Sequence, residues 1–428
     1  MRWLKVGLAS AMALATAASG ALGQTLTPPP VGPTRALDGE ATPAACEQFG
    51  YRPTPEDDQH PSRTSIGFAP LVSAPPPPLP PAQPLSPPAP LGLEVRERPE
   101  DIVALPSHIG VSGALVAPYP GPAGDTERYS DAPTNAVVVT AENPVSTLAI
   151  DVDTASYANV RRFLNDGALP PRDAVRVEEL INYFDYGYDR PGSRTEPFTV
   201  FTEVSDSPWA EGRQILHVGL QGYELDRDER PPLNLVFLID VSGSMAPADR
   251  LPLAQQALNT LIDQLRPEDR VGIVVYAGAA GAVLQPTPGD QRLRMRCAIN
   301  ALRSGGSTAG GQGLALAYQM AEANFDRDRV NRVVLLTDGD FNVGVTSDQR
   351  LEDFVAARRE SGVYLSVYGF GRGNYNDSLM QTIAQAGNGT AAYVDSLDEA
   401  NRLFRDDFSG SVFPIADDVK VQIEFNPA

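Results

Sequence analysis

Several oxygen-bearing side chains follow apolar segments that have the pattern of buried strands. The apolar runs 234–239 (NLVFLI) and 330–337 (VNRVVLLT) are separated by a glycine-rich segment, 304–311 (SGGSTAGG). The side chains directly after these runs or within the glycine-rich segment are Asp240, Ser242, Ser244, Thr308 and Asp338. Because ligands of open α/β sheets bind beyond the carboxyl ends of the central strands, we expect these five side chains to converge on one point.

The chemistry of this set favours a hard metal ion. The five side chains offer two carboxylates and three hydroxyls, with no nitrogen and no sulfur ligand. Oxygen-only shells suit Mg²⁺ and Ca²⁺, and a shell with few carboxylates and room for water suits Mg²⁺ better. We therefore expect Mg²⁺, with Mn²⁺ or Ca²⁺ as alternatives. A single Ser or Thr after a strand is more often a helix N-cap, so the prediction depends on all five occurring together.

The elements that must position these residues alternate between strand and helix. Nearly continuous apolar runs predict buried strands at 234–239, 271–276, 330–337, 363–368 and 391–394. Apolar residues at helical spacing predict helices at 251–265, 291–302, 313–324, 351–360, 378–386 and 396–408. This alternation predicts an α/β fold with a Rossmann-like, mostly parallel sheet covered by helices on both faces. A short strand at 282–284 follows its neighbour too closely for a crossover helix and is expected to be antiparallel.

The five candidate residues resemble the motif of a known family. The von Willebrand factor type A (vWA) family carries a metal-ion-dependent adhesion site with the pattern Asp-x-Ser-x-Ser, a distant Thr and a distant Asp. The residues that match it position by position are Asp240, Ser242, Ser244, Thr308 and Asp338. The resemblance covers about 233–408. It implies a vWA fold and metal-dependent protein binding, in which an acidic residue of a protein partner fills an open coordination position.

A wider resemblance extends beyond these residues. Ala149–Asn165 is similar to the segment that precedes the vWA domain in a bacterial exported family. Residues 335–344 (LLTDGDFNVG), 359–371 (RESGVYLSVYGFG) and 422–428 (QIEFNPA) look like the same family. Those relatives continue past the last of these segments, so we expect the chain to be truncated within a C-terminal flanking domain.

Two further functions stay open beside the binding module. Asp151 and Asp153 nearly match the Asp-x-Asp nucleophile loop of haloacid-dehalogenase-type phosphatases, which also need a cation to steady the phosphoryl group. No lysine lies between Lys5 and Lys420, so Arg162 would have to serve. The third function is that of a structural envelope-assembly protein with a vestigial metal site. We expect the binding module and no enzymatic activity.

Composition argues against several classes of function. The chain has 428 residues, a net charge of −20, two lysines and three histidines. Nucleic-acid binding depends on clustered Lys and Arg, so we expect no nucleic-acid partner. The glycine-rich segment lacks the Gly-Lys-Ser/Thr of a phosphate-binding loop. Serine catalysis would need a base, and His217 is the only histidine in the part predicted to fold.

The first 125 residues predict export and a spacer. Met1–Gly23 has the charged start, apolar run and small residues of a secretory signal peptide. We therefore expect a protein of the periplasm, cell envelope or extracellular space, with no membrane span after cleavage. Residues 24–125 hold 24 of the 40 prolines, which predicts a disordered, extended linker. Cys46 lies in that linker and Cys297 on a predicted helix, so we expect both cysteines to be unpaired.

The remaining boundaries follow from changes in the pattern. We expect a small α+β, β-sandwich-like flanking domain at 126–232, the vWA domain at 233–409 and the start of a C-terminal flanking β domain at 410–428. Strands in the flanks are predicted at 146–153, 198–204, 214–220 and 419–425. Neither flank alone has enough strands for a stable sheet, so we expect the last three strands to pair in one antiparallel sheet.

Overall fold

The computed structural model describes residues 39–51, 127–129, 136–150, 152–225, 229–306, 310–339, 341, 348–407, 410, 412–416 and 419–426. The predicted signal peptide and most of the predicted linker lie outside the described residues, as do Asp151 and Thr308. In the part that is described, no helix is both long and apolar enough to cross a bilayer.

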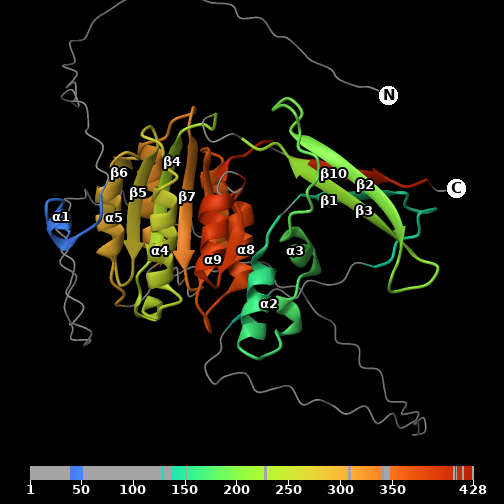
Figure 1. Ribbon diagram of the computed structural model, residues 1–428, viewed down its shortest axis with the longest axis horizontal. Coiled ribbons are helices and arrows are strands. Elements are labelled where there is room, and N and C mark those ends of the chain that lie inside the picture. The colour runs from blue at the N-terminus through green and yellow to red at the C-terminus, as the bar shows by residue number, and fades with distance from the viewer. Residues whose placement is uncertain are drawn as a thin grey trace, which may run out of the picture. The chain divides into compact units, whose positions relative to one another are not determined.

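The largest sheet has six strands (Figure 1). They are β4 (Leu233–Asp240), β5 (Arg270–Tyr276), β6 (Ala280–Pro288), β7 (Val330–Thr337), β8 (Val363–Phe370) and β9 (Ala391–Val394). Their order is β6-β5-β4-β7-β8-β9, and every neighbouring pair is parallel except β5 with β6. The predicted parallel sheet with one antiparallel strand is confirmed, although that strand is longer than 282–284. The β5–β6 connection is too short for a crossover helix, so β6 returns antiparallel.

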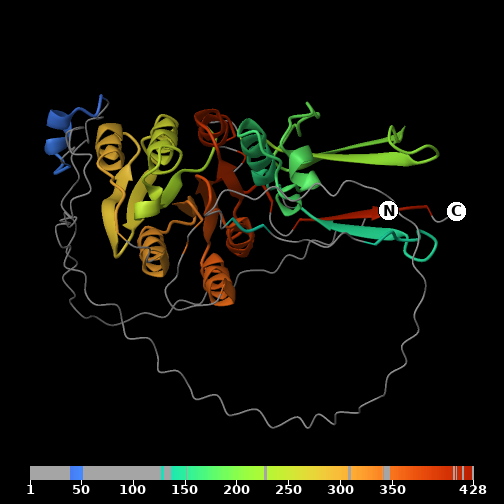
Figure 2. The same ribbon diagram turned by 90° about the horizontal axis from the view of Figure 1, so that it is seen from below.

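Helices cover both faces of this sheet (Figure 2). They are α4 (Leu251–Ile262), α5 (Arg292–Asn300), α6 (Gly310–Ala323), α7 (Asp348–Arg359), α8 (Asp377–Ala386) and α9 (Leu397–Asn401), which continues as the π-helical turn η3 (Arg402–Asp406). The first two and α9 share one apolar core with the sheet, whereas α6, α7 and α8 share a second core on the opposite face. Every residue of β4 and β7 is buried, which explains why these strands are unbroken apolar runs in the sequence.

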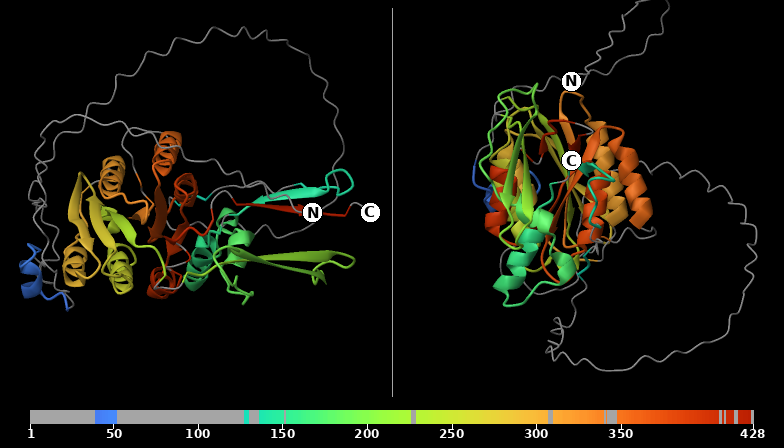
Figure 3. Two further views of the ribbon diagram at one scale, coloured as in Figure 1. Left: turned by 90° about the horizontal axis from the view of Figure 1, so that it is seen from above. Right: turned by 90° about the vertical axis from the view of Figure 1, so that its right-hand side faces the viewer.

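The segments before and after this α/β unit form two small antiparallel sheets (Figure 3). Their elements are β1 (Val145–Ala149), α2 (Ala155–Asn165), η1 (Arg172–Ala174), α3 (Val177–Asn182), β2 (Phe198–Asp206), β3 (Gln214–Gly222) and β10 (Lys420–Glu424). Pairing of β2 with β3 is as predicted, but β10 pairs with β1. The predicted three-stranded sheet is therefore wrong. The strand that the prediction left out, β1, offers β10 an antiparallel partner along its full length.

Cys46 and Cys297 form a disulfide bond, so the prediction that both are unpaired is wrong. Cys46 belongs to the short helix α1 (Pro43–Glu47), which packs against α5. Nearby, the Tyr51 hydroxyl donates to the Val283 carbonyl of β6 at 3.0 Å. Part of the predicted linker is therefore folded against the edge of the sheet. The bond joins residues 251 positions apart, a distance over which no local sequence pattern reports proximity.

Candidate metal centre

The two acidic residues of the predicted site lie at the carboxyl ends of adjacent parallel strands. Asp240 is the last residue of β4, and Asp338 directly follows β7. These strands pair in parallel with Ile239 opposite Leu336, so the register brings both carboxylates to the same edge of the sheet. This is the edge at which ligands of α/β folds bind.

The loop between β4 and α4 brings both predicted serines to this edge. The Ser242 backbone N–H donates to the Oδ1 atom of Asp240 at 2.8 Å, which turns the chain over the end of the strand. The Oγ atoms of Ser242 and Ser244 lie 2.9 Å apart, at the short 3-10 helix η2 (Gly243–Met245). One tight turn therefore gathers a carboxylate and two hydroxyls.

The start of the glycine-rich loop is attached to the same turn. The Gly243 N–H donates to the Gly306 carbonyl at 3.0 Å, and the Gly305 N–H donates to the Val241 carbonyl at 2.8 Å. Thr308 follows two residues later but lies outside the described residues, so its place in the site stays a prediction.

Both carboxylates are buried, and burial makes the negative charge of Asp240 unfavourable. Asp240 and Asp338 are each 0% exposed. Burial raises the pKa of Asp240 to about 6, and the neighbouring Asp338 carboxylate adds to the rise. A nearby hydroxyl, that of Thr337, lies 3.3 Å from the Oδ2 atom of Asp240 and donates only a long hydrogen bond. Two buried like charges of this kind are stabilised by a cation.

Arg250 is a residue of this site that the sequence interpretation missed. Its Nη1 atom donates to the Oδ2 atom of Asp338 at 2.5 Å and to the Ser244 carbonyl at 2.7 Å. The guanidinium therefore neutralises one of the two carboxylates and ties the β4–α4 loop to the end of β7. No local pattern marks Arg250, which directly precedes α4, because its partner Asp338 lies 88 residues further along the chain.

Close packing after Asp338 holds this carboxylate against the loop that follows β8. Gly339 has a φ of +100°, a conformation that other residues rarely adopt. A Cβ atom there would also lie 2.5 Å from the Asn374 carbonyl oxygen and 2.6 Å from the Asn376 nitrogen. Position 339 therefore requires glycine, and the Nδ2 atom of Asn374 comes within 3.5 Å of the Oδ2 atom of Asp338.

The donor set fits a hard divalent cation. Within the ranges that the structure describes, no three His, Cys, Asp or Glu side chains gather as a metal site, so a cation here needs hydroxyl oxygens as well as the two carboxylates. Two carboxylates and the one paired guanidinium give a formal charge of −1, which leaves negative charge for a cation to offset. A shell with few carboxylates also leaves the cation able to accept an oxygen ligand from outside.

Two residues named for the alternative phosphatase site have structural contacts. Asp153 is 7% exposed, and its Oδ1 atom accepts the N–H of Ala391 at the start of β9, at 3.0 Å. Arg162 donates to both carboxylate oxygens of Glu127, at 2.9 and 2.8 Å. Asp151 lies outside the described residues. The described contacts give no support to phosphoryl transfer.

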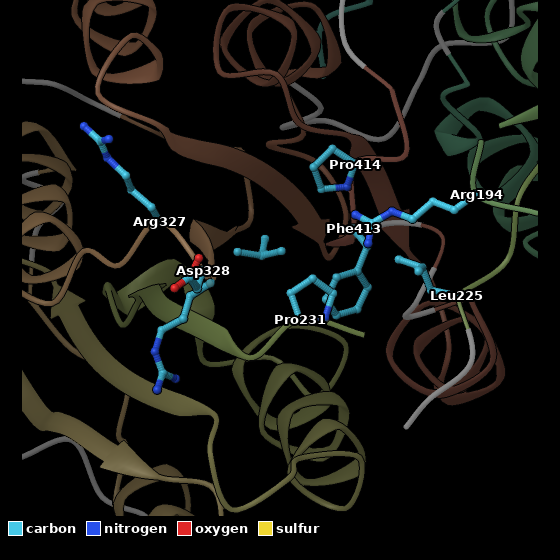
Figure 4. A pocket seen from close by; sticks show the side chains of 9 residues that line it. Arg194, Leu225, Pro231, Arg327, Asp328, Phe413 and Pro414 are labelled. Atoms are coloured by element: carbon cyan, nitrogen blue, oxygen red, sulfur yellow. The ribbon is translucent and has the colours of Figure 1, made fainter. Parts of the chain in front are cut away.

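A cavity of about 260 Å³ lies at the opposite end of the sheet from the candidate metal centre. Pro231 precedes β4 and Val330 begins β7, which places the cavity at the amino ends of these strands. Arg194 extends toward Phe413 in this cavity, whereas Arg327 points away from it (Figure 4). The cavity and the candidate metal centre are therefore separate features.

Two family models match the chain. The model described as von Willebrand factor type A domain matches residues 234–406, which contain all six strands of the large sheet but for the first residue of β4. A second model, described as von Willebrand factor, matches residues 123–217.

Several similar proteins come from bacteria. The uncharacterized protein YfbK of Escherichia coli (strain K12) is 46% identical over 309 residues, which cover 71% of this chain and 54% of YfbK. The uncharacterized protein sll0103 of Synechocystis is 34% identical over 183 residues, which cover 42% of each protein. The chain thus spans about half the length of the curated relatives it matches. Among solved structures, a von Willebrand factor type A protein from Catenulispora acidiphila is 21% identical, with a TM-score of 0.37, and the match covers 54% of this chain and 52% of that protein.

Proposed function

The chain belongs to the von Willebrand factor type A domain family, and from this premise we propose that it is a metal-dependent protein-binding module. Domains of this family are generally protein-interaction modules. The proposal adds two specific features: a divalent cation at the carboxyl end of β4 and β7, with Mg²⁺ as the first choice, and a protein partner that presents an Asp or Glu side chain to it.

The observation that carries the proposal is the gathering of oxygen atoms around two buried carboxylates. Ser242 and Ser244 bring their Oγ atoms within 2.9 Å of each other directly after Asp240. Asp240 and Asp338 are both 0% exposed, and Arg250 offsets only one of their two charges. Groups of this kind are unfavourable in a protein interior unless a cation or further donors compensate them.

Each residue has a separate part in the proposed site. Asp240 would hold the cation with a carboxylate oriented by the Ser242 N–H. Both serines would add hydroxyl oxygens, and Thr308 would complete the set from the glycine-rich loop. Asp338, held by Arg250, would act directly or through water. The bound cation would supply an electrophilic position for the partner's carboxylate, so the chemistry is binding rather than catalysis.

We also propose that the protein is exported from the cytoplasm. The predicted signal peptide supports export to the periplasm, the cell envelope or the extracellular space. Because the chain spans about half the length of its curated relatives, the proposal concerns the binding module and not the activity of a longer protein.

The proposal is tested by capture of partners from a native envelope extract on the immobilised protein. We expect partners to be retained in Mg²⁺, released by EDTA and retained again when Mg²⁺ is restored. Asp240→Ala should abolish retention, because it removes one of the two carboxylates. The matched control is Asp328→Ala, which removes an exposed carboxylate at the other end of β7 and should leave retention unchanged.

Two outcomes would contradict the proposal. Retention that is insensitive to EDTA would mean that partners bind without a cation. Equal retention by wild type and Asp240→Ala would mean that a metal-dependent surface exists elsewhere on the chain.

A further inference from the structure

Arg250 contacts two loops as well as the candidate metal ligand Asp338. Besides Asp338 and the Ser244 carbonyl, its guanidinium binds the Arg372 carbonyl through Nη2. Arg372 lies in the loop that follows β8. The side chain of Arg250 is only 11% exposed, so these contacts are shielded from water. The Arg250 guanidinium therefore joins the turn after β4, the residue after β7 and the loop after β8.

The loop after β8 is shaped around Arg250. Gly371 has a φ of +76°, and a Cβ atom at this position would overlap the Arg250 side chain. On its other side, the Gly371 carbonyl accepts the hydroxyl hydrogen of Tyr393 from β9 at 2.7 Å. The loop is thus packed between Arg250 and β9, so Arg250 has little freedom to move without the loop.

The same loop holds a segment that is distant in sequence. The Gly373 N–H donates to the Oε1 atom of Glu127 at 2.8 Å. Arg128, which follows Glu127 in the sequence, donates its backbone N–H to the Tyr375 carbonyl, and its own carbonyl accepts the Asp377 N–H, both at 2.9 Å. Residues 127–129 therefore attach to the loop after β8 and to the first residue of α8 by three backbone donors. One of these donors, the Gly373 N–H, belongs to the same peptide group as the Arg372 carbonyl that Arg250 binds.

Glu127 also binds a residue of helix α2. Arg162 of α2 binds both carboxylate oxygens of Glu127, and the two side chains are 5% and 3% exposed. The guanidinium of Arg162 also lies 5.3 Å from the centre of the Tyr393 ring. A continuous set of hydrogen bonds thus runs from Asp338 through Arg250 and the loop after β8 to Glu127 and α2.

From this geometry we infer that Arg250 is a positioning residue that couples occupancy of the metal centre to the attachment of residues 127–129. The inference rests on the proposed function, because it needs a cation at Asp338. A cation that fixes the Asp338 side chain also fixes the Arg250 guanidinium bound to it. The guanidinium in turn fixes the Arg372 carbonyl and the neighbouring Gly373 N–H. Coupling between two sites is reciprocal, so loss of the Glu127 contact must weaken cation binding by the same factor.

Other contacts between the same parts of the chain do not pass through Arg250. Arg161 of α2 donates to Asp395 at 2.5 and 2.8 Å, and Arg176 donates to Asp377 at 2.6 Å. These pairs join α2 to the residue that follows β9, and the segment before α3 to α8, by contacts that do not involve Arg250. They provide a control that separates coupling through Arg250 from a general loosening of the attached segment.

The first measurement is hydrogen exchange of the full chain, with and without Mg²⁺. We expect Mg²⁺ to slow exchange of the Arg128 and Gly373 amides by about fivefold or more in wild type. In Arg250→Lys, Mg²⁺ should still bind, since every candidate ligand is kept and the net charge of the site is unchanged. A single ammonium group cannot replace the planar guanidinium at two carbonyls and a carboxylate, so the Mg²⁺-dependent protection should be lost.

The second measurement is Mg²⁺ affinity by calorimetry. Glu127→Gln, which touches no candidate ligand, should weaken Mg²⁺ binding by about fivefold in the wild-type background and leave it unchanged in the Arg250→Lys background. The control Asp395→Asn removes the acceptor charge of Arg161 and should leave the affinity unchanged.

Each outcome decides between the two proposals. If Mg²⁺ binds wild type without slowing the two amides, or if Arg250→Lys keeps the protection, the coupling is absent although the metal centre stands. If Asp395→Asn weakens binding as much as Glu127→Gln does, the effect is general loosening and the coupling through Arg250 is refuted. If wild type does not bind Mg²⁺ at all, the proposed function fails and the coupling fails with it.

Discussion

Cys46 is bonded to Cys297 of α5 across 251 positions of sequence, and this bond attaches residues 39–51 to the edge of the large sheet. The two cysteines are buried in a small apolar cluster with Leu293. Tyr51 and Glu127 both lie in segments that are held by contacts of their own, since the Tyr51 hydroxyl binds the Val283 carbonyl and Glu127 is bound by Arg162.

Removal of the disulfide should destabilise the protein measurably. Cys297→Ser should lower the free energy of unfolding by about 2–4 kcal/mol, because a covalent link over a long loop restricts the unfolded chain. Urea denaturation under oxidising conditions measures this change. Cys46→Ser and the double variant should each show the same loss as Cys297→Ser, whereas additive losses would mean that the two cysteines act independently.

Asp240→Ala should separate metal binding from folding. It removes a fully buried carboxylate whose pKa is raised by burial and by the neighbouring Asp338, so the metal-free variant should melt no lower than metal-free wild type. Mg²⁺ should raise the melting temperature of wild type alone, corresponding to about 2.7 kcal/mol at a concentration of 100 Kd. Differential scanning calorimetry tests this, and an equal Mg²⁺-dependent rise in both proteins would show that the cation binds elsewhere.

Asp269 should matter for stability and not for the metal centre. Its carboxylate accepts two hydrogen bonds from Arg230, at 3.0 and 2.6 Å, and the backbone N–H groups of Leu233 and Arg266. Asp269→Ala leaves a buried guanidinium without its acid and should lower the free energy of unfolding by about 3–5 kcal/mol.

The matched control replaces both charged partners of this pair. Arg230→Met combined with Asp269→Leu should recover much of the loss, because no buried charge is then left uncompensated. Chemical denaturation provides the stabilities, and the Mg²⁺-dependent stabilisation should persist in the variants that fold. Disappearance of that stabilisation would link Asp269 to the metal centre, against this expectation.

Glu127 should make part of the stability dependent on pH. Burial acts to raise the pKa of Glu127, but the hydrogen bonds and charge of Arg162 outweigh it, so the pKa lies below its ordinary value of 4.5. A carboxyl with a lowered pKa in the folded state stabilises the fold above about pH 4.5, and this contribution disappears as the pH falls through the folded pKa.

Glu127→Gln should therefore be less stable than wild type at neutral pH and should lose less stability on acidification. Urea midpoints measured from neutral pH down to about pH 3.5 would show the two curves converging. Glu142→Gln, which changes an exposed carboxylate, is the control and should follow wild type throughout. Parallel curves for wild type and Glu127→Gln would refute the role of the Glu127–Arg162 pair.

The sequence alone was sufficient for features that depend on local pattern. The runs at β4 and β7 are apolar without interruption because both faces of these strands are buried, so they could be recognised without knowledge of their neighbours. Asp240 and Asp338 could be placed together because the carboxyl ends of parallel strands share one edge of a sheet. The Ser242–Ser244 contact follows from a short turn, which is also local.

Tertiary structure decided the contacts between residues that are far apart in sequence. Pairing of Cys46 with Cys297, binding of Asp338 by Arg250 and the choice of β1 as the partner of β10 each depend on where the folded chain brings distant segments. A periodic pattern reports which face of an element is buried, but it carries no information about which distant residue meets that face. For the same reason the prediction placed β10 beside β2 and β3, which have strand patterns as good as that of β1, and the choice among them came only from the path of the folded chain.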